Sequence, residues 1–110
     1  MIVEVVTGAD ERPEARVVDV DDLGRLHLAL GQVTDDEAAE VLERAGLGRF
    51  TDSENAVLDV AALRAAAEPR ATAPDWQARW DEMVAHARTK GWLSDDGAGL
   101  RVHVESAAGA

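Results

Sequence analysis

Apolar and polar residues alternate over the first thirty positions of the chain in the manner of β-strands. Residues 1–7, MIVEVVT, are rich in β-branched side chains, and residues 14–20, EARVVDV, follow the same pattern. Residues 23–30, LGRLHLAL, carry leucine at positions 26, 28 and 30, so one face would be buried and the other would contact water or a partner. An acidic turn with Asp21, Asp22 and Gly24 predicts a hairpin between the second and third strands. We therefore expect a three-stranded antiparallel N-terminal sheet.

The pattern then changes to the period of an α-helix. Thr34 is followed three residues later by Glu37, which predicts a capping box, and Gly46 is placed to end this helix in a left-handed conformation. Its apolar stripe consists of Ala38, Val41, Leu42 and Ala45. A short strand is expected around residues 56–58, and Asp59 is expected to cap a second helix that stops before Pro69.

A third helix is predicted over residues 75–90 and ends at Gly91. Its apolar stripe has helical spacing and consists of Trp76, Trp80, Met83, Val84 and Ala87. We expect the tryptophan-bearing side to face the interior. The side turned outward would then consist of Ala78, Glu82, Ala85 and Thr89. This side would pack on another part of the chain or form an interface with another protein.

The C-terminal stretch 90–106, KGWLSDDGAGLRVHVES, has the pattern of two short strands around a glycine-bearing turn. A helix followed by such a hairpin ends a winged-helix domain, and the predicted element order matches a winged helix from residue 34 onward. The predicted fold class is α+β: the three-stranded antiparallel N-terminal sheet, three helices and a C-terminal β-hairpin. Residues 1–105 would form a single domain, and residues 106–110 would form a flexible tail.

Composition limits the class of protein. The chain has 110 residues, 46% of them hydrophobic and 30% charged, and it has no cysteine. It has no apolar run long enough to cross a membrane and no secretory signal pattern, so we expect a cytoplasmic protein without disulfides. Ten arginines against one lysine, together with 21 alanines, are typical of a GC-rich bacterial genome.

The net charge of −11 argues against nucleic acid as a partner, because neutralised phosphate provides most of that affinity. The outward side of the third helix also lacks the arginine, lysine, asparagine and glutamine that read base edges. The acidic residues are concentrated in the first half: residues 1–55 have net charge −9 and residues 56–110 have −2. Such a surface attracts a basic protein partner.

Neither a metal site nor a catalytic centre is predicted. His27, His86 and His103 lie on different elements without the spacing of a helical metal pair. The acidic stretch 19–24 places leucine where a calcium loop needs a carboxylate, so we interpret it as a solvated turn. Glu82 lies four residues before His86 and could pair with it on the helix surface, but no serine lies in a nucleophile elbow. We expect no cofactor.

A ligand pocket is the remaining possibility for a small site. Trp80 and Trp92 could form its aromatic walls, with His86 and Arg101 beside them to bind a small anion.

The sequence predicts a small acidic cytoplasmic protein that acts as a non-catalytic protein-interaction or accessory module, with a protein partner or a second copy of itself. Two alternatives stay open. One is a winged-helix-type DNA-binding regulator. The other is a small ligand-binding protein or enzyme with a tryptophan-lined pocket.

Overall fold

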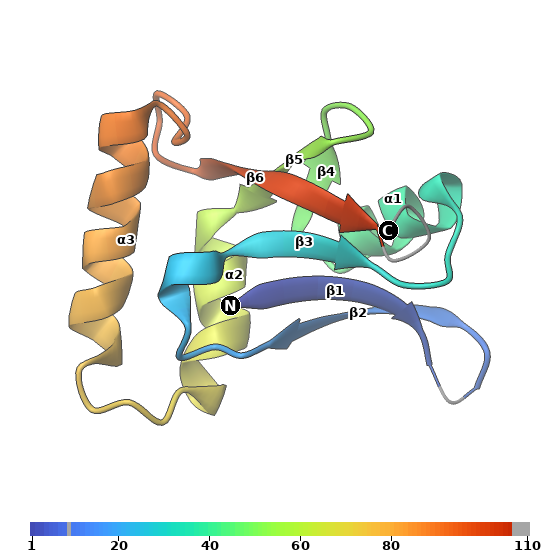
Figure 1. The fold of residues 1–110 in the computed structure, drawn as a ribbon, viewed down its shortest axis with the longest axis horizontal. Helices are drawn as coiled ribbons and strands as arrows, with labels where there is room; N and C mark the ends of the chain where they lie inside the picture. Colours follow the sequence, from blue (N-terminus) through green and yellow to red (C-terminus); the bar gives the residue numbers. More distant parts are fainter. Residues whose placement is uncertain (9, 107–110) are drawn as a thin grey trace.

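The computed structural model describes residues 1–8 and 10–106, which form six strands and three α-helices around one sheet (Figure 1). The strands are β1 (Ile2–Thr7), β2 (Pro13–Val18), β3 (His27–Leu30), β4 (Gly48–Phe50), β5 (Asn55–Asp59) and β6 (Gly99–Ser106). The helices are α1 (Asp35–Arg44), α2 (Val60–Ala67) and α3 (Trp76–Lys90), with short 3-10 turns η1 (Leu23–Arg25) and η2 (Glu68–Arg70).

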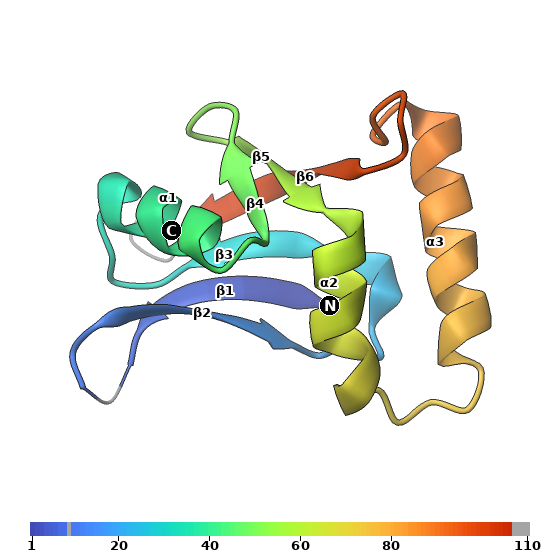
Figure 2. The same ribbon diagram turned by 180° about the vertical axis from the view of Figure 1, so that it is seen from behind.

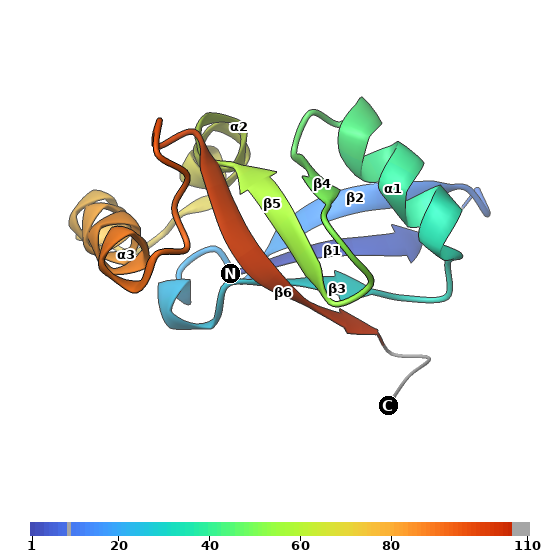
Figure 3. The same ribbon diagram turned by 90° about the horizontal axis from the view of Figure 1, so that it is seen from above.

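The sheet is mixed, and its six strands lie in the order β2-β1-β3-β6-β5-β4. β3 runs parallel to both β1 and β6, whereas the pairs β1–β2, β5–β6 and β4–β5 are antiparallel. The sheet curves into a half-barrel (Figure 3). The overall α+β class holds in this arrangement.

The predicted three-stranded antiparallel N-terminal sheet is wrong, because β3 pairs with β1 in parallel and lies on the side of β1 away from β2. The acidic stretch with Asp21, Asp22 and Gly24 is therefore not a hairpin turn. It is part of a longer crossover, which includes η1 and passes the end of β1. The register sets Val3 opposite Leu28, so both buried residues lie on the same face of the sheet.

The predicted C-terminal β-hairpin is also wrong. Only an isolated bridge between Leu93 and Leu100 remains of it, and β6 instead fills the centre of the sheet between β3 and β5. The alternation of buried Leu100, Val102 and Val104 matches the buried faces of both neighbouring strands. The winged-helix element order from residue 34 therefore does not describe this fold, because the strand after α3 is a central strand and not half of a wing. β4, only three residues long, was not predicted.

The local helix signals are confirmed. The Thr34 hydroxyl accepts from the Glu37 backbone N–H and the Glu37 carboxylate accepts from the Thr34 N–H, which completes the capping box. Gly46 has φ 72°, and the following Leu47 N–H donates to the Leu42 carbonyl at 3.2 Å, a geometry that closes α1. The Asp59 carboxylate accepts from the Ala62 N–H at 2.8 Å and caps α2.

The main core lies between one face of the sheet and the helices α1 and α2 (Figure 2). The largest of its fully buried side chains are Met1, Leu28, Leu42, Leu58, Leu63, Val3 and Val5. On β6 the opposite sheet face carries the exposed residues Arg101, His103 and Glu105. This division follows from the period-two alternation of the strands.

α3 stands at one end of the sheet, apart from α1 (Figures 1 and 2). Trp76 and Trp80 are only 3% and 2% exposed, so the tryptophan-bearing side of α3 faces the interior as predicted. The predicted outward residues Ala78, Glu82, Ala85 and Thr89 are all exposed. The prediction that this side packs on another part of the chain is therefore wrong.

Ser106 is the last residue of β6, and the rest of the predicted tail, residues 107–110, lies outside the described residues. Over the described part of the chain, no helix combines the length and the apolar character needed to cross a membrane.

Gly48 is required by the close approach of β4 to β5. A Cβ at this position would lie 2.2 Å from the Val57 carbonyl oxygen and 2.9 Å from the Leu58 Cα. We expect Gly48→Ala to lower the free energy of unfolding by about 3 kcal/mol, because the backbone must move to accept the methyl group. Gly24→Ala is the control: its nearest neighbour would be an Asp22 oxygen at 4.0 Å, and it should cost under about 0.5 kcal/mol. Equal urea unfolding midpoints for the two variants would contradict the strand packing.

Candidate functional site

A groove of about 630 Å³ lies between α3, η1 and the first half of β6. Below it is called the α3 groove. Its apolar lining consists of Leu23, Leu26, Met83, Ala87, Trp92, Leu100 and Val102. Its polar and charged lining consists of Asp21, Asp22, Arg79, Glu82, His86 and Arg101, with Gly24 beside them.

One wall of the α3 groove is positioned by hydrogen bonds between the start of α3 and the end of β2. The Trp76 indole N–H donates to the Val20 carbonyl at 2.7 Å, and the ring stacks on Trp80 with centroids 5.4 Å apart. From the preceding connector, Arg70 donates to the Val17 carbonyl at 2.7 Å. These bonds fix α3 against a segment that is distant from it in the sequence.

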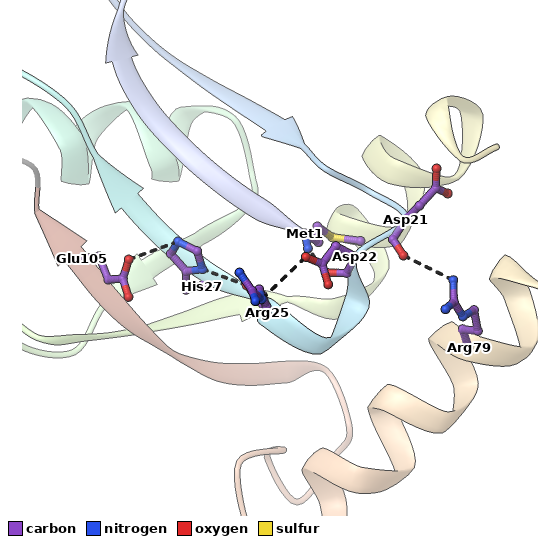
Figure 4. Close-up of polar contacts among 7 residues, drawn as sticks. All are labelled: Met1, Asp21, Asp22, Arg25, His27, Arg79 and Glu105. Carbon is purple, nitrogen blue, oxygen red and sulfur yellow. Dashed lines mark hydrogen bonds and ion pairs between the residues drawn. The ribbon is translucent and has the colours of Figure 1, made fainter. Parts of the chain in front are cut away.

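Asp21 forms the second half of this attachment. Its carboxylate accepts from the Thr72 N–H at 3.0 Å, from the Thr72 hydroxyl and from the Ala73 N–H at 3.2 Å. Its carbonyl accepts from Arg79 at 3.5 Å (Figure 4). The Thr72 hydroxyl, more than any other neighbour, lowers the pKa of the Asp21 carboxyl, and the two backbone N–H groups act in the same direction.

The Met1 ammonium group contacts the same crossover, since it donates to the Asp22 carbonyl (Figure 4). The Met1 side chain is fully buried. The crossover that forms one edge of the α3 groove is thus held from two sides.

The opposite end of the α3 groove is formed by the turn that follows α3. Gly91, at φ 77°, ends the helix, and the Trp92 N–H donates to the Ala87 carbonyl at 2.9 Å. The Arg101 N–H donates to the Trp92 carbonyl at 2.7 Å, which ties this turn to β6. Trp92 is 41% exposed and is the only large hydrophobic side chain exposed in the described part of the chain. Its ring meets His86 edge to face, with centroids 5.7 Å apart.

Three of the four predicted ligand residues therefore lie together. His86, Trp92 and Arg101 all line the α3 groove, whereas Trp80 is buried behind it in the stack with Trp76. The helical stripe that predicted burial of Trp80 already placed it in the core, so its proposed role as a pocket wall was inconsistent with that stripe.

Of the four residues predicted as a partner interface, only Glu82 lines the α3 groove. Ala78, Ala85 and Thr89 are exposed and are not among the residues that line it. Met83 and Leu26 were not predicted as site residues, although both lie in apolar patterns that the sequence displays. Both are half-buried at the groove.

The charged side chains of the α3 groove differ in whether they have partners. Arg79 lies 3.7 Å from Asp75, and Arg25 lies 3.9 Å from Asp22. Among the described residues, neither Glu82 nor Arg101 has an ion-pair partner within 4.0 Å, and the predicted contact of Glu82 with His86 is not formed. Within residues 1–8 and 10–106, the groove thus has one anion on α3 and one cation on β6 without an ion-pair partner.

A second polar cluster lies on the open sheet face (Figure 4). His27 Nε2 lies 3.4 Å from a Glu105 oxygen, and His27 Nδ1 lies 2.7 Å from the Arg25 carbonyl oxygen. Both ring nitrogens are already occupied, so this cluster serves the strand pairing of β3 with β6. Within residues 1–8 and 10–106, no group of three histidines, aspartates or glutamates is placed to hold a metal ion.

No protein-family model, curated protein or solved structure matches this chain.

Asp21→Asn tests the attachment of α3. An acid whose pKa is lowered in the fold stabilises the folded state above its ordinary pKa of 3.8, and this contribution is lost as the pH falls through the lowered value. We expect the variant to be less stable than the wild type at pH 7 and the difference to shrink below pH 3.8. The measurement is the urea midpoint between about pH 2 and pH 7. Asp95→Asn, on an exposed turn, is the control; a pH-independent difference for Asp21→Asn would contradict the attachment.

Acrylamide quenching of tryptophan fluorescence tests the exposure of Trp92. Trp76 and Trp80 are almost fully buried and Trp92 is 41% exposed, so the wild type should contain one accessible emitter and two protected ones. Trp92→Phe is expected to remove the accessible component and leave emission that acrylamide quenches only weakly. Unchanged quenching in this variant would show that the groove rim is built differently.

Proposed function

We propose that this chain is a non-catalytic binding module that accepts a segment of a partner protein in the α3 groove. The observation that carries the proposal is Trp92, a large aromatic side chain left 41% exposed at the rim of a groove with an apolar floor. Tryptophan and arginine are the residues most enriched among those that dominate protein–protein binding energy. Trp92 and Arg101 lie side by side here.

The openness of the site favours a chain segment over a small molecule. Glu82, His86, Trp92 and Arg101 are all exposed along the walls. Small-ligand sites usually enclose 70–90% of the ligand surface, roughly, and open walls do not provide this. An extended segment needs only a groove and one or two side-chain pockets.

A basic or mixed-charge partner agrees with the charge of the chain. The net charge of −11 creates a field that accelerates encounter with basic proteins and repels acidic ones. A cytoplasmic location is part of the proposal, since the chain has no cysteine.

A small carboxylate ligand is the second candidate. Arg101 could pair with the carboxylate while Trp92 and His86 contact the rest of the molecule. This candidate predicts binding of single small acids, whereas the protein-segment proposal predicts binding of peptides with capped ends.

Selection from a random peptide library displayed on phage tests the proposal. Peptides enriched on the wild type should share a large apolar residue, and Trp92→Ala should weaken their binding at least about tenfold, because hot-spot aromatics contribute 2 kcal/mol or more, roughly. Ala85→Arg is the matched control, since it blocks the outward side of α3 but not the groove.

Two outcomes of this selection count against the proposal. Peptides that bind Trp92→Ala as well as the wild type would exclude the α3 groove as the site. Peptides that lose binding only to Ala85→Arg would move the interface to the predicted outward set on α3.

A further inference from the structure

We infer that the segment bound in the α3 groove carries an apolar side chain flanked by one basic and one acidic residue. The basic residue would lie toward Glu82 on the α3 wall and the acidic residue toward Arg101 on the β6 wall. This inference rests on the proposed function, and it specifies the chemistry of the partner.

The apolar side chain of the bound segment would contact the floor of the α3 groove. Leu26 and Met83 are half-buried there, and Leu100 and Val102 are 3% and 6% exposed beneath them. Together with Trp92 at the rim they offer apolar surface to a single large side chain, whose burial contributes about 1.5–3 kcal/mol. The volume of about 630 Å³ lies within the usual size of binding pockets.

Glu82 is the charge on the α3 wall for which the described part of the chain provides no ion-pair partner. One turn earlier on the same helix, Arg79 is engaged by Asp75 and by the Asp21 carbonyl. One turn later, His86 contacts the Trp92 ring. Asp22, across the groove mouth, adds a second exposed carboxylate whose only described ion-pair partner, Arg25, is 3.9 Å away. This wall therefore favours a lysine or arginine side chain.

Arg101 is the corresponding cation on the β6 wall. The acid whose pKa it helps to lower, Asp52, is held mainly by the Glu54 N–H at 2.7 Å and by Asn55, and Arg101 makes the smallest contribution to that lowering. The Arg101 side chain is exposed, while its backbone N–H donates to the Trp92 carbonyl, so the guanidinium is available on the exposed side of β6. An arginine can pair with a carboxylate through two parallel charge-assisted hydrogen bonds.

These two walls reject segments of uniform charge. An all-acidic segment would oppose Glu82 and the net charge of −11, and an all-basic segment would oppose Arg101. A segment of mixed charge satisfies both walls with the apolar side chain between them. The α3 groove would therefore select a segment by the order of the charges on either side of its apolar side chain, as well as by the size of that side chain.

Four capped pentapeptides test this: acetylated and amidated GKLEG, GELKG, GKLKG and GELEG, added to the full ¹⁵N-labelled chain. Binding is followed by the NMR shift of the Trp92 indole N–H. We expect the better of the two mixed-charge peptides to bind about threefold more tightly than either uniform one, the effect of one half-exposed ion pair.

Two variants assign the charges to the walls. In Glu82→Gln, GELEG should gain affinity relative to the mixed peptides. In Arg101→Gln, GKLKG should gain affinity relative to the mixed peptides. Thr89→Ala, outside the groove on α3, is the control and should leave the order of the four peptides unchanged.

The outcomes separate the two proposals. If the Trp92 shift gives the same affinity for all four peptides, the inferred order of charges is overturned and the protein-segment proposal is left intact. If GKLKG binds most tightly to the wild type and to both groove variants, the acidic chain attracts basic peptides in general. That outcome also overturns the inferred order of charges. No Trp92 shift with any peptide would overturn both.

Discussion

The hydrogen bond from the Trp76 indole to the Val20 carbonyl is the contact on which the placement of α3, and with it the α3 groove, depends. A buried indole N–H must find an acceptor, and here the acceptor lies 56 residues away in the crossover after β2. The stack with Trp80 adds apolar area to the same joint. Because α3 makes its main contact with η1 and stands apart from the helices that cover the sheet, this joint decides where α3 lies.

The α3 groove follows from that placement. Once the start of α3 is fixed against the crossover, the end of the helix lies beside β6, and Gly91 turns Trp92 out of the interior. The Trp92 side chain, which would otherwise extend the buried apolar stripe of α3, therefore lies at the rim of the groove. Glu82 and Arg101 then line one groove although they come from two elements that no local pattern connects.

Part of the candidate site could be predicted from the sequence. His86, Trp92 and Arg101 were grouped for their chemistry, and they do lie together, but Trp80 belongs to the core. The predicted ligand residues and the predicted partner interface also meet, since Glu82 of the interface set lines the same groove. The contribution of the crossover with Asp21 was not predicted, because its acidic residues have the composition of a simple turn.

What the sequence determined by itself was local: the capping box at Thr34, the cap at Asp59, the stop at Gly46, and the inward side of α3 with Trp76. These features depend on side chains that reach a few residues along the chain. What only the tertiary structure decided was which strands pair, since β1, β3 and β6 display the same alternation and any of them could neighbour another. Pairing is chosen by burial shared across the whole sheet, and that choice carried residues 99–106 from a predicted hairpin into the centre of the sheet.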